Sequence, residues 1–272
     1  MNKKQLKHIT DEHYRLLKKH IKKIAENFDA DAIHEFRVVY KKLRAFFRMI
    51  NAGNKKNGKI KLSKKLKQVY GMAGSIRDLQ LQQQRVGEAT AEEYKLPKDY
   101  LDRLQQTIDM LKPGFTDLWQ DNPVDKCKKK TDALIPDEFS LQRFRDFVTQ
   151  KWASVHTIIK YRQLRDDHLH TIRKHLKDLF YNLKIFDESE GAIISQGIWK
   201  EKDEAYYFQL LDELGSFQDR CMAISLLDKK WVNGLNSYNR KKLVRVKNNW
   251  MIEKRQLKQM LVIKLGSGMA GQ

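Results

Sequence analysis

Residues 33–50 have the sequence IHEFRVVYKKLRAFFRMI, in which apolar side chains recur at alternating intervals of four and three positions. The members of this apolar series are Phe36, Tyr40, Leu43, Phe47 and Ile50. A helical turn of about 3.6 residues keeps such positions on one face. The spacing therefore predicts an amphipathic helix that buries this face.

Apolar spacing of the same kind covers most of the chain. It marks helical segments at residues 6–28, 33–50, 62–84, 101–112, 141–163, 169–186, 199–231 and 237–265. Alternating runs of β-branched residues, which are typical of strands, are nearly absent. We predict an all-α protein.

The two halves of the chain align when one is shifted by 136 positions. The apolar series recurs as Ile172, Leu176, Leu179, Leu183 and Phe186. After a five-residue difference in length, GSIRD at residues 74–78 aligns with GSFQD at residues 215–219. This pattern indicates an internal duplication, and we predict two similar helical bundles related by a pseudo-twofold axis.

Prolines mark the boundary between the halves. Three of the four prolines in the chain are Pro113, Pro123 and Pro136, a clustering that is typical of a linker. We predict a first bundle at residues 1–122, a linker at 123–140 and a second bundle at 141–272.

A second series on the 33–50 helix is basic. Its members are His34, Arg37, Lys41, Arg44 and Arg48. A helix face that is merely solvated normally interleaves acids with its bases, and this series contains no acid. The shifted helix keeps the series as His170, Arg173, Lys177 and Lys184, with Phe180 in place of Arg44. Because stacked like charges repel, we interpret both series as anion-binding faces.

Each histidine of the basic series follows an aspartate by three residues. Asp31 and Asp167 are predicted N-caps, which places His34 and His170 in the first helical turn. The histidines either help to close their helix ends or face a phosphate oxygen together with the free amides of that turn. The sequence leaves both interpretations open.

Charge and composition narrow the class of protein. The chain has 272 residues, 41% of them hydrophobic, and a formal net charge of +20. Residues 1–136 carry 30 basic and 17 acidic side chains and residues 137–272 carry 24 and 17, so both halves are basic. Such an excess predicts a polyanionic partner. Two distant cysteines and the lack of a long apolar run favour a cytoplasmic protein without a membrane span.

The repeated motifs resemble those of a known family. His34-Glu35-Phe36-Arg37-Val38, then Lys41-Lys42-Leu43-Arg44, then Gly74-Ser75-Ile76-Arg77-Asp78 is similar to the pattern of the CHAD family, the conserved histidine α-helical domain. The resemblance covers roughly residues 5–260. It implies a pair of four-helix bundles around a basic central cavity that binds inorganic polyphosphate. Phe180 and Gln218 replace basic residues of the pattern, so we expect the second half to contribute less to binding.

Other functions have weaker support. A nucleic-acid-binding protein is the alternative, since it explains the same charge, but the aromatic residues lie mostly at core spacing. A phosphohydrolase using His34 and His170 lacks a metal cluster. We interpret Asp78 and Asp219 as ion-pair partners that orient neighbouring bases, not as catalytic bases. We therefore predict no enzyme, no cofactor and no metal.

The predicted polyphosphate site combines both basic series with bases outside them. It comprises His34, Arg37, Lys41, Arg44, Arg48, Arg77, His170, Arg173, Lys177, Lys184, Lys65, Lys241 and Arg245.

Overall fold

The computed structural model describes residues 1–52, 58–91, 96–190 and 203–269. Within these ranges the regular structure is helical, which confirms the all-α prediction. The helices are α1 (Lys3–Asn27), α2 (Ala30–Ala52), α3 (Lys64–Ala89), α4 (Lys98–Gln120), α5 (Pro123–Asp132), α6 (Leu141–Ile159), α7 (Asp166–Glu190), α8 (Glu204–Ser225), α9 (Lys229–Val232) and α10 (Ser237–Met269). None of the described helices is long and apolar enough to cross a membrane.

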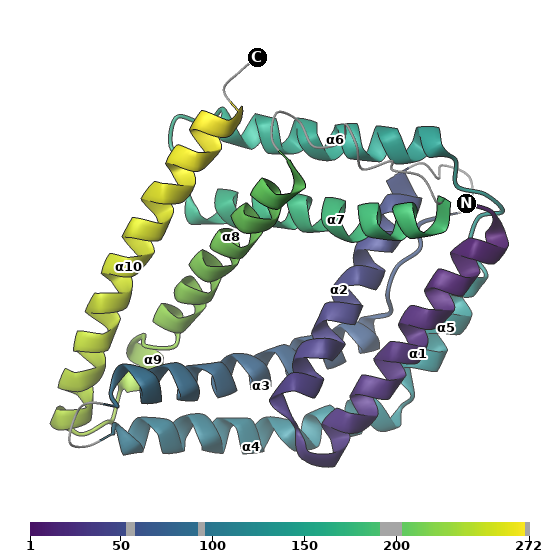
Figure 1. Ribbon diagram of the computed structural model, residues 1–272. Coiled ribbons are helices and arrows are strands. Elements are labelled where there is room, and N and C mark those ends of the chain that lie inside the picture. The colour runs from purple at the N-terminus through teal and green to yellow at the C-terminus, as the bar shows by residue number, and fades with distance from the viewer. Residues whose placement is uncertain (53–57, 92–95, 191–202, 270–272) are drawn as a thin grey trace.

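The helices form a four-sided frame (Figure 1). Helices α6 and α7 make one side and α3 and α4 the opposite side, while α1, α2 and α5 face α8 and α10 across the frame. Each side consists of helices that pack along one another, and α2 also packs against α7. This last contact joins the two halves of the sequence at the helices that carry the basic series.

The predicted apolar faces form part of the core. All five members of the series in α2 are buried, as are Ile172, Leu176, Leu179 and Leu183 in α7. The side chain of Phe186 lies outside the described residues. Each helix thus turns its apolar face inward, which leaves the adjacent basic face pointing away from the core. The duplication itself remains a prediction.

Helix α2 begins earlier than the sequence pattern suggested. The carboxylate of Asp29 accepts a hydrogen bond from the backbone N–H of Ala32 at 2.8 Å, so Asp29 caps the helix. Phe28, in the left-handed region at φ 55°, turns the chain there. Asp31 and Asp167 lie inside the first turns of α2 and α7, and the prediction that they are N-caps is wrong.

The proline-containing region is more ordered than a linker pattern suggests. Helix α4 continues through Pro113 to Gln120, and α5 falls within residues 123–140. The Tyr14 hydroxyl lies 2.9 Å from Thr131 Oγ1, which attaches α5 to α1. Residues 123–132 therefore pack with the first half, while the proposed division at 122 and 141 remains a prediction.

Candidate functional site

The basic faces of α2 and α7 meet where the two helices pack together. Burial first, and then repulsion from neighbouring cations, lowers the pKa of Lys41 to about 8. The cations responsible are Arg37 and Arg44 on α2 and Arg173 and Lys177 on α7. Burial, followed by Arg173, also lowers the pKa of Lys177. Cations from both halves of the chain therefore share one electrostatic environment.

None of these cations forms an ion pair with a carboxylate in the part of the chain that the structure describes, although Asp78 lies near Arg37 and Lys41, and Asp212 lies near Lys177. Together with Arg77 of α3 we call them the central cations, namely Arg37, Lys41 and Arg44 of α2, Arg77 of α3, and Arg173 and Lys177 of α7. Three of them, Arg44, Arg77 and Arg173, have a buried Nε without a hydrogen-bond partner. The three side chains are otherwise partly exposed, so their terminal nitrogens can donate to the oxygens of an anion.

Two tyrosines support the arginines of α2. Tyr40 and Tyr70 stack with their ring centroids 4.1 Å apart. The guanidinium of Arg37 lies 5.2 Å from the Tyr70 ring centroid and that of Arg44 lies 6.0 Å from it. Such cation–π contacts hold an arginine without neutralising it. Tyr70 was not predicted as a site residue, although this tyrosine precedes the GSIRD segment by one helical turn.

The glycine of each GSxxD segment makes room for an arginine. A Cβ on Gly74 would lie 1.8 Å from Nη1 of Arg37, so the guanidinium of α2 rests directly on the backbone of α3. At the corresponding Gly215 of α8, a Cβ would lie 3.2 Å from Nη2 of Arg173. These contacts give a physical reason for glycine in both segments.

The aspartates of the same segments face each other across the halves. Burial raises the pKa of Asp78, Arg37 opposes the shift, and the nearby Asp219 adds to it. Asp219 pairs with Arg85 of α3 at 3.5 Å. Asp219 is thus an ion-pair partner as predicted, whereas Asp78 makes no ion pair with any described residue and the prediction is wrong for it.

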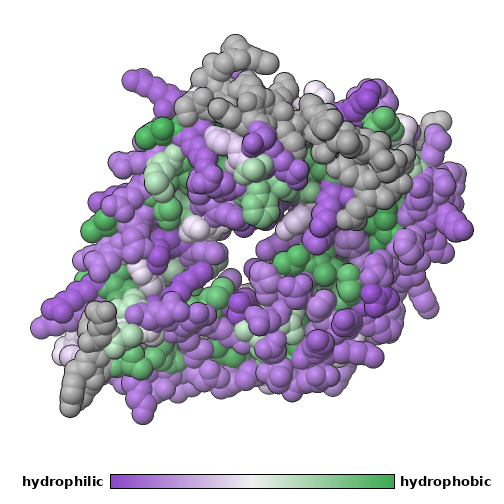
Figure 2. All heavy atoms as spheres, in the orientation of Figure 1, coloured by the Kyte–Doolittle hydropathy of each residue, from purple (hydrophilic) through white to green (hydrophobic). Residues whose placement is uncertain are grey.

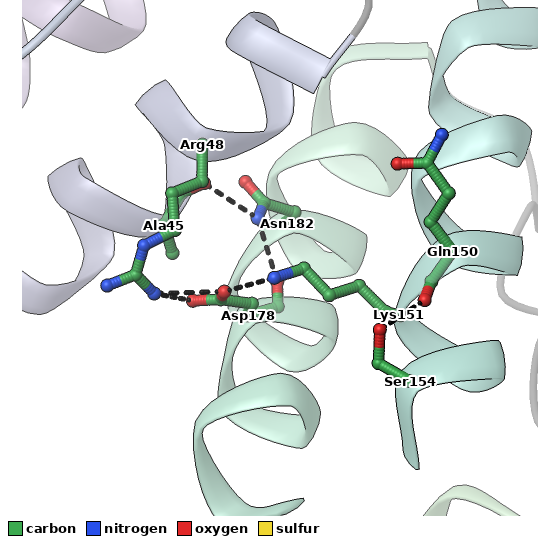
Figure 3. A network of polar contacts seen from close by, with 7 residues as sticks. All are labelled: Ala45, Arg48, Gln150, Lys151, Ser154, Asp178 and Asn182. Carbon is green, nitrogen blue, oxygen red and sulfur yellow. Dashed lines mark hydrogen bonds and ion pairs between the residues drawn. The ribbon is translucent and has the colours of Figure 1, made fainter. Parts of the chain in front are cut away.

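Arg48 differs from the central cations in having a carboxylate partner, although it lines the same cavity as Arg44. Its guanidinium pairs with the buried carboxylate of Asp178 on α7 at 2.7 Å, and Lys151 of α6 pairs with the same carboxylate (Figure 3). Within the basic series of α2, Arg48 thus differs from Arg37, Lys41 and Arg44, because its charge is already paired within the protein.

The other predicted residues lie at the edges or farther away. His34, His170 and Lys184 are exposed on α2 and α7. Burial, then the nearby Lys174, lowers the pKa of His170, and a hydrogen bond with Gln218 opposes this shift. Lys65 is ion-paired with Asp121. Lys241 and Arg245 are exposed on α10, and none of the hydrogen bonds or ion pairs of the described residues joins them to the central cations.

Open space lies next to these side chains. Figure 2 shows the middle of this face hollowed, with hydrophilic residues along much of its rim. A cavity of about 270 Å³ adjoins Arg44 between α2 and the start of α3, and Arg48, Lys61 and Lys67 also line it. An extended anion has room both in the hollow and beside Arg44.

Other site chemistries have less support. Among the described residues, no group of three or more histidine, cysteine, aspartate or glutamate side chains is arranged to hold a metal ion. Cys127 and Cys221 are free thiols. The ionisable side chains that come together at this place are mainly cations.

Comparison with known proteins places these features in a family. The family model described as CHAD domain matches residues 8–228. The fold is similar to the crystal structure of the CHAD domain from the plant Ricinus communis, with a TM-score of 0.73 and 12% sequence identity. That match covers 100% of this chain and 92% of the plant chain. No curated protein that was compared with the sequence matches it.

Proposed function

The chain belongs to the CHAD domain family, and from that premise we propose that it binds inorganic polyphosphate without transforming it. The observation that carries this proposal is the group of unpaired central cations contributed by α2, α3 and α7. Burial first, and then their mutual repulsion, lowers the pKa of Lys41, and the repulsion is relieved when an anion binds among them.

The kinds of cation suit a flexible chain of phosphates. Arginine presents a planar fork of donors, and lysine presents a compact charge with three donors that rotate freely. Four arginines and two lysines in one region accommodate phosphate groups in many orientations. This mixture supports a polymer of repeated phosphates over a single carboxylate held in one geometry.

The tyrosines favour polyphosphate over nucleic acid. Proteins that bind single strands commonly offer aromatic faces on which bases stack. Tyr40 and Tyr70 instead stack on each other, and Arg37 covers Tyr70. A ligand that needs only phosphate contacts therefore suits this surface better than one that must also stack its bases.

We assign the direct contacts to the central cations. His34, His170, Lys184, Lys241 and Arg245 are proposed as additional contacts for the parts of a long polymer that leave the centre. We propose a cytoplasmic location because the two cysteines are free, as is typical of proteins from reducing compartments.

A competition experiment tests the proposed function. Long-chain polyphosphate labelled at one end is bound to the protein at ~150 mM salt. Unlabelled polyphosphate, DNA or RNA is then titrated in, and the competitor concentrations are compared per phosphate group. We expect polyphosphate to displace the label at much lower concentration than either nucleic acid. Displacement by DNA or RNA at equal or lower concentration would contradict the proposal and favour the nucleic-acid alternative.

A further inference from the structure

A buried carboxylate joins three helices next to the central cations. The side chain of Asp178 on α7 is only 6% exposed. Nη1 of Arg48 on α2 donates to its two oxygens at 2.7 and 2.9 Å, and Nζ of Lys151 on α6 donates to one of them at 2.7 Å (Figure 3). A charge this deeply buried requires such partners, because an unpaired buried carboxylate is strongly destabilising.

An amide extends the same cluster between α7 and α2. Asn182 is fully buried, and its Nδ2 donates to the backbone carbonyl of Ala45 at 3.2 Å and to that of Asp178 at 2.7 Å. The link thus reaches the backbone of α2 as well as the side chain of Arg48. We call Arg48, Lys151, Asp178 and Asn182 the interhelix cluster.

The interhelix cluster lies directly beside the central cations in sequence. Asp178 follows Lys177, and Arg48 lies about one helical turn after Arg44. Under the shift of 136 positions, Asp178 corresponds to Lys42, so α7 carries an acid where α2 carries a base. An acid at this position weakens the long-range attraction for a polyanion. Ligand attraction therefore does not explain Asp178, whereas its contacts with α2 and α6 do.

We propose that Asp178 is a positioning residue, which fixes α2 against α6 and α7 so that the central cations face one ligand, and that Arg48 serves this contact instead of the ligand. This inference rests on the proposed function. It predicts that removing the negative charge of Asp178 weakens polyphosphate binding, whereas long-range electrostatics alone predicts a gain.

Asp219→Asn is the matched control for charge. It also removes one acid near the centre, but Asp219 is largely exposed and, among the described residues, its carboxylate pairs only with Arg85, at 3.5 Å. We expect Asp178→Asn to lower polyphosphate affinity about tenfold and to flatten the salt slope, while Asp219→Asn leaves affinity unchanged or raises it. Equal gains in affinity from both variants would overturn the inference.

A second variant covers the case in which Asp178→Asn does not fold. Combining Arg48→Met, Lys151→Met and Asp178→Leu replaces the charges by apolar side chains, which buried ion clusters often tolerate. Circular dichroism verifies the fold. Affinity should stay within about fourfold of the wild type, with an unchanged salt slope. Fourfold is about the loss expected when one phosphate contact is removed at ~150 mM salt. A flatter slope, like that of Lys41→Gln, would make Arg48 a ligand contact and overturn the inference.

Amide hydrogen exchange without ligand separates this inference from the proposed function. Asp178→Asn should speed exchange in residues 41–52 and 171–185 relative to Asp219→Asn, because the contact between α2 and α7 loosens. Exchange that matches the wild type would contradict the positioning role even if polyphosphate binds. Weak polyphosphate binding by the wild type itself would instead contradict the proposed function.

Discussion

Helices α2 and α7 carry basic residues at the same spacing but surround them differently. On α2, Arg37, Lys41 and Arg44 are all unpaired, and Tyr70 supports both arginines. On α7, Phe180 occupies the place of Arg44 and packs against Phe208, with the ring centroids 6.0 Å apart. One helix concentrates positive charge, while the other gives part of the same face to packing.

The next corresponding position also makes α2 more positively charged than α7. Position 42 of α2 is a lysine, whereas Asp178 of α7 binds Arg48 and Lys151. The difference teaches that similar helical patterns can divide the work of a site. Helix α2 carries three of the central cations, and α7 carries two together with Asp178, which pairs with bases of α2 and α6.

The largest expected effect comes from neutralising the face of α2. Replacing Arg37, Lys41 and Arg44 together by glutamine should weaken polyphosphate binding about 50-fold at ~150 mM salt and flatten the salt slope by about 2, because three phosphate contacts are lost. Thermal stability should hold or rise as repulsion is relieved. Affinity measured at several salt concentrations, with a melting curve for each variant, tests this.

The matched variant lies on α7. Arg173→Gln with Lys177→Gln removes two cations, so we expect about a 15-fold loss and a smaller change in salt slope. A loss from this pair as large as that from the triple variant would show that the faces contribute equally. Unfolding of the triple variant would instead show that the α2 cations are structural.

The next effect comes from making α7 and α8 of the second half more like α2 and α3 of the first. Phe180→Arg with Gln218→Arg restores two cations of the family pattern and should raise affinity by up to about 15-fold. The melting temperature should fall, because Phe180 loses its contact with Phe208. Unchanged affinity in a correctly folded protein would contradict the idea that both helices face one ligand.

The sequence predicted the helices and their inward faces because burial follows a simple periodicity. Phe36 and Ile172 illustrate this, since both are completely buried at the positions that the spacing assigns to the core. The same spacing identified the basic series of α2 and α7. It could not place Lys41 beside Arg173, because that proximity depends on how α2 packs against α7.

Partners of charged residues were the least predictable part of the site. Arg48 and Lys41 look alike in the basic series, but only Arg48 reaches the carboxylate of Asp178. Local sequence also misplaced the cap of α2, because Asp29 and Asp31 are equally suitable by residue type. The turn at Phe28 decides between them, and a positive φ at phenylalanine leaves no pattern in the sequence.

A smaller effect concerns the pH at which Lys41 is charged. Its pKa of about 8 in the free protein rises when an anion binds, so binding takes up a proton above that pH. Polyphosphate affinity should therefore be constant below about pH 7.5 and fall by up to about fourfold by pH 9.5. Titration calorimetry in two buffers of different ionisation enthalpy measures the proton uptake.

Folding stability without ligand should show the opposite trend. Because the pKa of Lys41 is lower in the folded than in the unfolded chain, the unfolded chain holds more protons between about pH 8 and 10.5. The contribution of Lys41 therefore destabilises the protein below pH 8 and is relieved as pH rises through this window. Lys41→Gln should reduce both pH effects and leave the part that is expected from Lys177, and undiminished effects in that variant would assign them to another group.

The smallest expected effect compares the two glycines on which the arginines rest. Gly74→Ala places a methyl group where Nη1 of Arg37 lies, so this arginine must leave the backbone of α3 and its position over Tyr70. We expect about a threefold loss of polyphosphate affinity, which is somewhat less than the loss expected when one phosphate contact is removed. Gly215→Ala needs only a shift of a few tenths of an ångström in Arg173, and affinity should change less than twofold.

Stability should move in the other direction from affinity. Alanine within a helix is more stable than glycine by about 0.5–1 kcal/mol, and the displaced group in each case is the flexible end of an arginine. Both variants should therefore melt at or above the temperature of the wild type. A fall in melting temperature for Gly74→Ala, accompanied by unchanged affinity, would mean that Arg37 stabilises the packing of α2 on α3 and does not contact the ligand. Equal losses of affinity in both variants would instead remove the distinction between α2 and α7, because it rests on Arg37 being the more closely held of the two arginines.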